Sequence, residues 1–172
     1  MSTGRIDEAY ARYALTANRT GTYLGWFRAV AKKYPNVPRT VVLADLVKLT
    51  PGDEGKWFAA AKDAGLLDEA IALANRTPCD PKTLTRAARD FAEKDPVFAV
   101  EAGLAALRWL VQGYGFEITS ADVWAAYAHT IKAAANAHVS EEIRSRIRAL
   151  IDSANARGGF VAKIIGRDVG LP

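Results

Sequence analysis

The sequence predicts an all-α protein of stacked antiparallel helical hairpins, and three observations lead to that prediction. Apolar residues recur at helical spacing in ten segments of the chain. Most of these segments begin at a capping residue or end at glycine or proline. The links between them are short, and short links make consecutive helices antiparallel neighbours. No segment alternates apolar and polar residues over the length that a half-buried strand needs.

Composition favours one globular domain over residues 1–172. Half of the residues are hydrophobic, which argues against disorder, and the length is typical of one domain. The net charge of +4 is mildly basic, but the two signs alternate along most of the chain, as on a solvated surface. The first ten residues contain no apolar signal segment, so we expect a cytoplasmic protein with no membrane partner.

The N-terminal half is expected to form five helices, over residues 5–17, 22–34, 39–49, 51–64 and 67–76. Helical spacing places Tyr10 and Tyr13 on the inner face of the first helix and Leu49 on that of the third. Thr50 and Pro51 resemble a helix start, with a capping hydroxyl followed by proline in the first turn. Gly65 ends that fourth helix, because glycine adopts the left-handed conformation at little cost.

The C-terminal half is expected to form five more helices: at about residues 81–94 and 96–113, two that begin at Thr119 and Ser140, and a last one at about residues 160–167. The helix at 96–113 starts at Asp95 and Pro96 and is apolar on nearly every side. Its polar residues form one narrow stripe, so we expect other helices to surround it in a bundle. Gly103 leaves room for the close approach of a neighbouring helix.

Two internal matches suggest a repeated helix pair. The segment GRIDEA at residues 4–9 matches GLLDEA at residues 65–70, and Trp26-Phe27 matches Trp57-Phe58. The first offset is close to twice the second, which indicates a unit of roughly 30 residues.

Residues 65–81 resemble the second helix of a tetratricopeptide repeat and its closing turn. By this resemblance, residues 4–81 are expected to form repeat-like helical hairpins. The period is not kept beyond Asp80, so residues 82–172 are predicted to form a helical bundle that caps the array. The whole chain also resembles helical regions of uncharacterised bacterial proteins, some of which carry a SWIM-type zinc finger. The cysteine and histidine pattern of that finger is absent here, so no metal function carries over.

The sequence contains no recognisable catalytic, cofactor or metal motif. Cys79 is the single cysteine, which excludes an internal disulfide and a multi-cysteine zinc site. His129 and His138 lie too far apart along the chain to share a helix face as an i, i+4 metal pair does, and phosphate-binding glycine motifs are absent. We therefore expect no enzyme and no cofactor. An enzyme whose residues meet only in the folded chain is a third, weaker interpretation.

The favoured function is a non-catalytic interaction module that binds a protein or peptide in a groove between helices. Tryptophans 26, 57, 109 and 124 all have helical spacing typical of core packing. The spacing places Phe27 and Trp57 inward, which leaves Trp26 and Phe58 as candidates for partial exposure; the alternative is that both Trp-Phe pairs are buried between stacked hairpins. An exposed aromatic with basic neighbours suits an acidic or C-terminal peptide. The candidate partner-binding residues are Trp26, Arg28, Lys32, Lys56, Phe58 and Lys62.

The alternative is a nucleic-acid-associated helical domain that uses two basic stripes. Such stripes suit a phosphate backbone. Acidic residues four positions on, such as Asp90, Glu93 and Asp152, suggest that the arginines are paired within their own helices instead. The candidate residues are Lys82, Arg86, Arg89, Arg144 and Arg148.

Overall fold

The structure, a computed structural model, describes residues 10–19, 21–153 and 159–171, of which 76% are helical. No strand occurs among these residues, and the prediction of an all-α fold is confirmed. The first half of the repeat match, residues 4–9, lies outside the described residues. The resemblance to tetratricopeptide repeats therefore stays a prediction.

The helices follow the chain in the order that the sequence predicts. The first part contains the π-helical turn η1 (Tyr10–Ala14), α2 (Leu15–Ala17), α3 (Tyr23–Lys33), α4 (Arg39–Leu49), the 3-10 turn η2 (Glu54–Trp57), α5 (Phe58–Asp63) and α6 (Leu67–Arg76). The second part contains α7 (Pro81–Phe91), α8 (Pro96–Val111), α9 (Ser120–Asn136), α10 (Ser140–Ser153), α11 (Gly159–Ile165) and the 3-10 turn η4 (Gly166–Val169).

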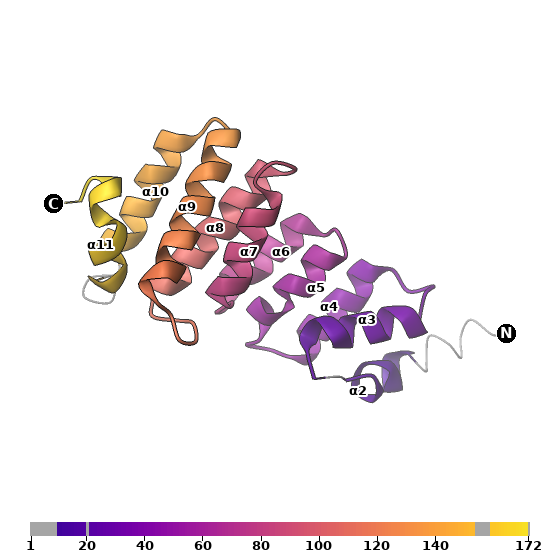
Figure 1. The fold of residues 1–172 in the computed structure, drawn as a ribbon. Helices are drawn as coiled ribbons and strands as arrows, with labels where there is room; N and C mark the ends of the chain where they lie inside the picture. The colour runs from indigo at the N-terminus through magenta and orange to yellow at the C-terminus, as the bar shows by residue number, and fades with distance from the viewer. Residues whose placement is uncertain (1–9, 20, 154–158, 172) are drawn as a thin grey trace.

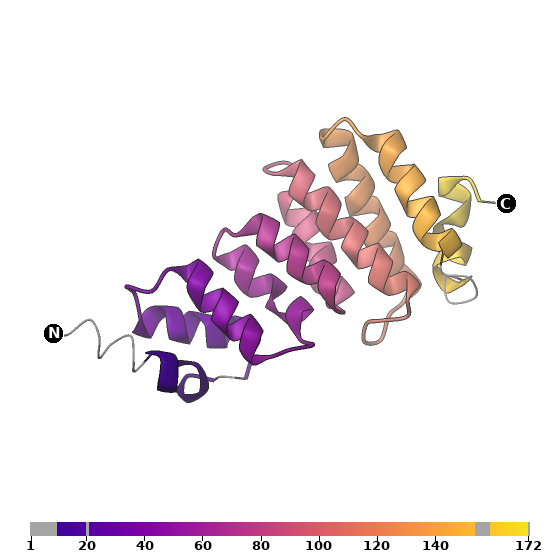
Figure 2. The ribbon, with the colours of Figure 1, turned by 180° about the vertical axis from the view of Figure 1, so that it is seen from behind.

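The helices form an elongated stack of two layers, with the two ends of the chain at opposite ends (Figure 1). Helices α3, α5, α7 and α9 lie in one layer, and α4, α6, α8 and α10 lie in the other, which faces the viewer in Figure 2. Helix α8 packs against α6, α7, α9, α10 and α11. Twelve of its residues are buried, as its apolar sequence predicts.

Three helix starts in the second half depend on side-chain caps that the sequence shows directly. Asp80 accepts hydrogen bonds from the backbone N–H groups of Lys82 and Thr83, and Asp95 accepts one from Phe98. Thr119 and Asp122 form a reciprocal capping box at the start of α9. Each cap satisfies backbone donors that lack a partner in the first turn, so these boundaries are fixed locally.

The predicted helix start at Thr50 is wrong. Residues 50–53 form a turn in which the backbone N–H of Asp53 donates to the carbonyl of Thr50 at 3.1 Å, with Gly52 at a φ of +90°. Proline followed by glycine suits this turn, because the third position needs a positive φ. The Thr50 hydroxyl donates to the carbonyl of Leu46 at 2.9 Å, so it closes α4 instead.

Four residues predicted to face the core are exposed. Leu49, the last residue of α4, is 44% exposed, and Tyr13 is 63% exposed. Tyr13 points outward because the π-helical turn has more residues per turn than an α-helix, which brings Ala14 inward. On α9 the helical spacing predicts that Trp124, Tyr127, Ala128 and Ile131 face inward. Trp124 and Ala128 are exposed instead, while Val123 and Thr130 are buried.

Candidate functional site

The candidate aromatic anchors of the peptide groove, Trp26 and Phe58, are not partly exposed; the alternative, burial of both Trp-Phe pairs, is what the structure shows. Trp26 is 2% exposed; its indole N–H donates to the carbonyl of Leu15 at 2.6 Å, and its ring lies 5.4 Å from that of Trp57. Phe58 is 1% exposed and stacks on Phe98 of α8 with the ring centroids 6.2 Å apart. Both aromatics therefore join neighbouring helices of the stack.

The burial of both members of each pair has a physical cause. A helix in the middle of a stack has neighbours on two sides, so it buries more than one face. Trp57 ends the 3-10 turn η2 and Phe58 begins α5. A 3-10 turn rotates the chain further per residue than an α-helix does. Trp57 consequently contacts Tyr23 and Trp26 of α3, while Phe58 contacts α8.

The four basic residues of the predicted groove do not gather around one apolar surface. Arg28 forms two hydrogen bonds with the carboxylate of Asp63, at 2.6 and 3.1 Å. Lys56 pairs with Asp53 at 3.0 Å and, together with Phe58, lines a shallow pocket of about 310 Å³. Lys32 is exposed and Lys62 is half-buried, and neither lines that pocket.

A cavity lies between α4 and α6, and we call it the α4–α6 cavity. Its volume is about 490 Å³. The apolar part of its wall comes from Leu43, Ala44 and Val47 of α4 and from Leu66 and Leu73 on the α6 side. Four charged residues complete the wall: Lys48, Glu54, Glu69 and Arg76. This is an apolar cavity with charges of both signs around it, as in many ligand and peptide sites.

One carboxylate oxygen in this wall lacks a partner. Glu54 Oε1 pairs with Arg76 Nη2 at 3.3 Å, while Oε2 is buried and accepts no hydrogen bond from any described residue. A buried acceptor without a donor costs about 1–3 kcal/mol, more when it is charged. Glu54 lines the cavity, so a ligand there lies beside a carboxylate that only Arg76 pairs with among the described residues.

A second, smaller cleft lies between α7 and α9, and we call it the α7–α9 cleft. Its volume is about 210 Å³. All three residues of the predicted α7 stripe, Lys82, Arg86 and Arg89, line it. Asp122 and His129 of α9 face them, and Leu110 and Ile118 contribute apolar surface.

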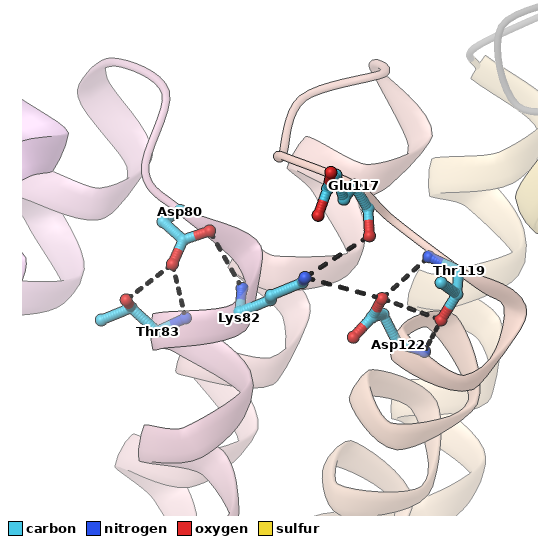
Figure 3. A network of polar contacts seen from close by, with 6 residues as sticks. All are labelled: Asp80, Lys82, Thr83, Glu117, Thr119 and Asp122. Carbon is cyan, nitrogen blue, oxygen red and sulfur yellow. Dashed lines mark hydrogen bonds and ion pairs between the residues drawn. The ribbon is translucent and has the colours of Figure 1, made fainter.

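One end of the α7–α9 cleft is closed by a polar network (Figure 3). The ammonium of Lys82 donates to the carbonyl of Glu117 at 3.4 Å and lies 3.9 Å from Asp122 Oδ2. The same Asp122 oxygen accepts hydrogen bonds from the backbone N–H and hydroxyl of Thr119, at 2.8 and 3.0 Å. These contacts lower the pKa of Asp122, chiefly through the Thr119 backbone N–H.

The prediction that the arginines pair within their own helices holds for only some of them. Arg89 pairs with the adjacent Asp90 at 2.9 Å, whereas Glu93 pairs with Lys132 of α9. Arg86 has no carboxylate partner in the described part of the chain; its Nη2 donates to Thr83 Oγ1 at 3.1 Å.

The second basic stripe does not continue the first. Arg144 and Arg148 lie on α10, in the other layer from α7. Arg144 pairs with Glu141 at 3.1 Å, and Arg148 donates to the carbonyl of Val169 at 2.7 Å rather than to the expected Asp152. The Arg148 contact therefore joins α10 to η4.

The titratable residues noted in the sequence have environments that explain them. Burial raises the pKa of the Cys79 thiol to about 12, and the Asp80 carboxylate adds to the shift, so the thiolate is disfavoured. Burial, with the positive charges of Arg89 and Lys132, lowers the pKa of His129. Within residues 10–19, 21–153 and 159–171, no three histidine, cysteine or acidic side chains gather as a metal site requires.

The comparisons with known proteins leave the family open. The chain matches no protein-family model, no curated protein and no solved structure. Among the helices that the structure describes, none combines the length and the apolar character needed to cross a bilayer.

Sequence reasoning missed the α4–α6 cavity, although α4 carries a signal for it. Val42 and Leu46 face the core and are fully buried. Leu43 and Val47 form a second i, i+4 apolar pair on the same helix. Two apolar stripes on one helix indicate a second contact surface. The contribution of α6 to the cavity is not visible from α4 alone, because it depends on how the hairpins stack.

Proposed function

We propose that this protein is a non-catalytic interaction module that binds an amphipathic helix of a partner protein in the α4–α6 cavity. The observation behind the proposal is the apolar wall built by Leu43, Val47 and Leu73 next to the unpartnered carboxylate oxygen of Glu54. The volume of about 490 Å³ lies within the range of about 300–1,000 Å³ that is usual for binding sites. We also propose the cytoplasm as its compartment, which is the expectation stated from the sequence.

A helical partner fits the architecture better than an extended one. An extended peptide usually gains affinity by adding a strand to a sheet edge, and the described residues contain no strand. A groove between two helices instead accepts the apolar face of a third helix, with anchors at i, i+3, i+4 and i+7.

The charged residues of the cavity wall favour a particular kind of amphipathic helix. The partner helix is expected to carry a lysine or arginine beside its apolar face, because the carboxylates of Glu54 and Glu69 line the cavity and one oxygen of Glu54 has no hydrogen-bond partner among the described residues. Hydrogen bonds to charged groups contribute about 1.5–3 kcal/mol, which corresponds to roughly tenfold or more in affinity. The proposal thus replaces the acidic or C-terminal peptide expected from the sequence with a basic amphipathic helix.

A display library of helical peptides tests the proposal with the full-length chain. Apolar residues are fixed at i, i+3, i+4 and i+7, and the flanking positions are randomised. Selected peptides are expected to be enriched in lysine and arginine, and their affinities are measured by fluorescence polarisation. Absence of any selected peptide with a Kd below about 100 μM would contradict the proposal.

Two tryptophan substitutions locate the binding site. Ala44 and Ala72 are both exposed, on α4 and α6, but only Ala44 lines the cavity. Ala44→Trp fills the cavity and is expected to weaken binding at least tenfold, while Ala72→Trp leaves it within about twofold. Equal affinities of the two variants, with unchanged melting temperatures, place the peptide elsewhere and overturn the proposal.

A Glu54→Gln variant tests whether Glu54 interacts with a cationic side chain of the partner helix. It keeps the shape of the side chain and removes its charge. Binding of a lysine-containing peptide is expected to fall about tenfold, while the same peptide with norleucine at that position loses much less. An equal loss of affinity for both peptides shows that Glu54 does not interact with the lysine charge.

A further inference from the structure

The α7–α9 cleft has more positive charge than its own carboxylates neutralise. Arg86 has no acidic partner among the described residues, and its one side-chain hydrogen bond goes to Thr83 Oγ1. Arg89 pairs with Asp90, but both side chains are about half exposed, so water weakens that ion pair and the Arg89 charge is only partly neutralised. His129 of α9 lines the same cleft. Three side chains with nitrogen donors, from two helices, therefore line one small space.

The volume of the cleft limits the size of the ligand that these side chains can bind. Its volume of about 210 Å³ is below the range of about 300–1,000 Å³ that holds a whole drug-sized ligand. It suits one charged end group, with a small apolar part of the ligand against Leu110 and Ile118. Arginine is the residue best suited to a phosphate, because its guanidinium donates two parallel hydrogen bonds.

We propose that the α7–α9 cleft binds the phosphate group of a phosphomonoester through Arg86, Arg89 and His129. This site is separate from the α4–α6 cavity and does not depend on the function proposed for it. Asp122 also lines the cleft, but its carboxylate is held by Thr119 and Lys82 at the end shown in Figure 3. Its charge is therefore partly compensated and lies away from the arginine end.

A single phosphate fits this surface better than a nucleic-acid backbone does. A polynucleotide needs a continuous basic track that follows successive phosphates. The second stripe lies on α10, in the other layer, and the Arg148 guanidinium is bonded to the carbonyl of Val169. Lys82 is bonded to Glu117 and Asp122. The accessible positive charge is therefore confined to one turn or two of α7.

Phenyl phosphate is the probe for the test, used with the full-length chain at pH 7.5. A phosphomonoester is mainly dianionic there, since its second pKa is about 6. The affinity is measured by NMR titration of the histidine ring signals. We expect saturable shifts of His129 and a rise in its pKa, because a bound dianion favours the imidazolium. His138 is exposed on the α9–α10 link and serves as the internal reference. No shift of His129 at millimolar phenyl phosphate overturns the proposal.

Matched arginine variants and a second probe separate the alternatives. Arg86→Gln is expected to weaken phenyl phosphate binding at least tenfold, whereas Arg167→Gln, an exposed arginine on η4, leaves it unchanged. Equal weakening by both variants shows a non-specific charge effect and overturns the site. A single-stranded DNA oligonucleotide without terminal phosphates is expected to bind more weakly than phenyl phosphate. Tighter binding of that oligonucleotide, lost in Arg86→Gln, would identify a nucleic-acid interface instead.

Discussion

Gly103 shows how one residue sets the distance between two helices. A Cβ atom at this position would overlap the side chain of Thr130 on α9. Thr130 is fully buried, and its hydroxyl donates to the carbonyl of Ala126 at 2.6 Å, so it has little freedom to move. The sequence prediction that another helix approaches α8 at Gly103 is confirmed.

Gly103→Leu is expected to lower the free energy of unfolding by about 1–3 kcal/mol through overpacking. This exceeds the gain of about 1 kcal/mol in helix propensity that follows the loss of glycine. The control is Glu101→Ala on the polar stripe, which removes an ion pair of 2.9 Å with Arg146 and is expected to cost less than about 1 kcal/mol. A urea series in which Glu101→Ala is the more damaging change would show that the packing of α8 on α9 is wrongly described.

Cys79 provides a pH prediction at the same scale. Its folded-state pKa of about 12 lies above the ordinary value of 9.0, so the folded chain holds the thiol proton more tightly than the unfolded chain does. The resulting stabilisation is complete below pH 9 and is lost as the pH rises toward 12. Ellman's reagent at pH 8 is expected to react slowly with the native chain and quickly in urea. Rapid reaction of the native chain would mean that the thiol is accessible.

The capping box of α9 gives a prediction about the stability of a single helix start. Thr119→Ala is expected to destabilise the protein by about 1 kcal/mol, because it removes the hydroxyl that accepts from the N–H of Asp122.

The lowered pKa of Asp122 means that its stabilising effect is present above its unfolded-state pKa and is lost as the pH falls through the folded value. The variant is therefore expected to show a smaller depression of that pKa in a carboxyl NMR titration. Ser120→Ala, beside the cap, is the control, and an equal effect of both changes would exclude a specific role for the cap.

The helices that sequence reasoning located best are those whose boundaries depend on neighbouring residues only. Asp80-Pro81, Asp95-Pro96 and the Thr119–Asp122 pair each fix a helix start within one turn. The errors lie where distant contacts decide. Trp26 and Phe58 have surface-compatible spacing, yet the adjacent hairpins cover them. The α4–α6 cavity likewise arises from the stacking of two hairpins, so neither helix alone predicts its volume.

At the scale of the whole molecule, α8 is the centre of the stack and is expected to be its most stable element. It packs against α6, α7, α9, α10 and α11 and contacts α5 through the Phe58–Phe98 pair, whereas α3 and α4 lie near one end (Figure 1). Local opening is cheaper where fewer buried contacts hold a segment. Native-state hydrogen exchange should therefore be slowest in the amides of α8 and faster in α3 and α4. Slowest exchange in α3 or α4 would contradict the central role of α8.

The two layers also explain why the molecule offers separate sites on separate helix pairs. The α4–α6 cavity lies between helices of one layer, and the α7–α9 cleft lies between helices of the other. A ligand in one site does not cover the other. Binding of a selected helical peptide and of phenyl phosphate is consequently expected to be independent.

Methyl NMR of the complex with a selected basic helical peptide tests the central claim most directly. Selective labelling of leucine and valine methyl groups reports on Leu43, Val47, Leu66 and Leu73 in the cavity wall, and on the more accessible Val97, Val139 and Leu150 away from it. The account predicts peptide-to-protein nuclear Overhauser effects to the first group. Nuclear Overhauser effects confined to the second group would contradict it.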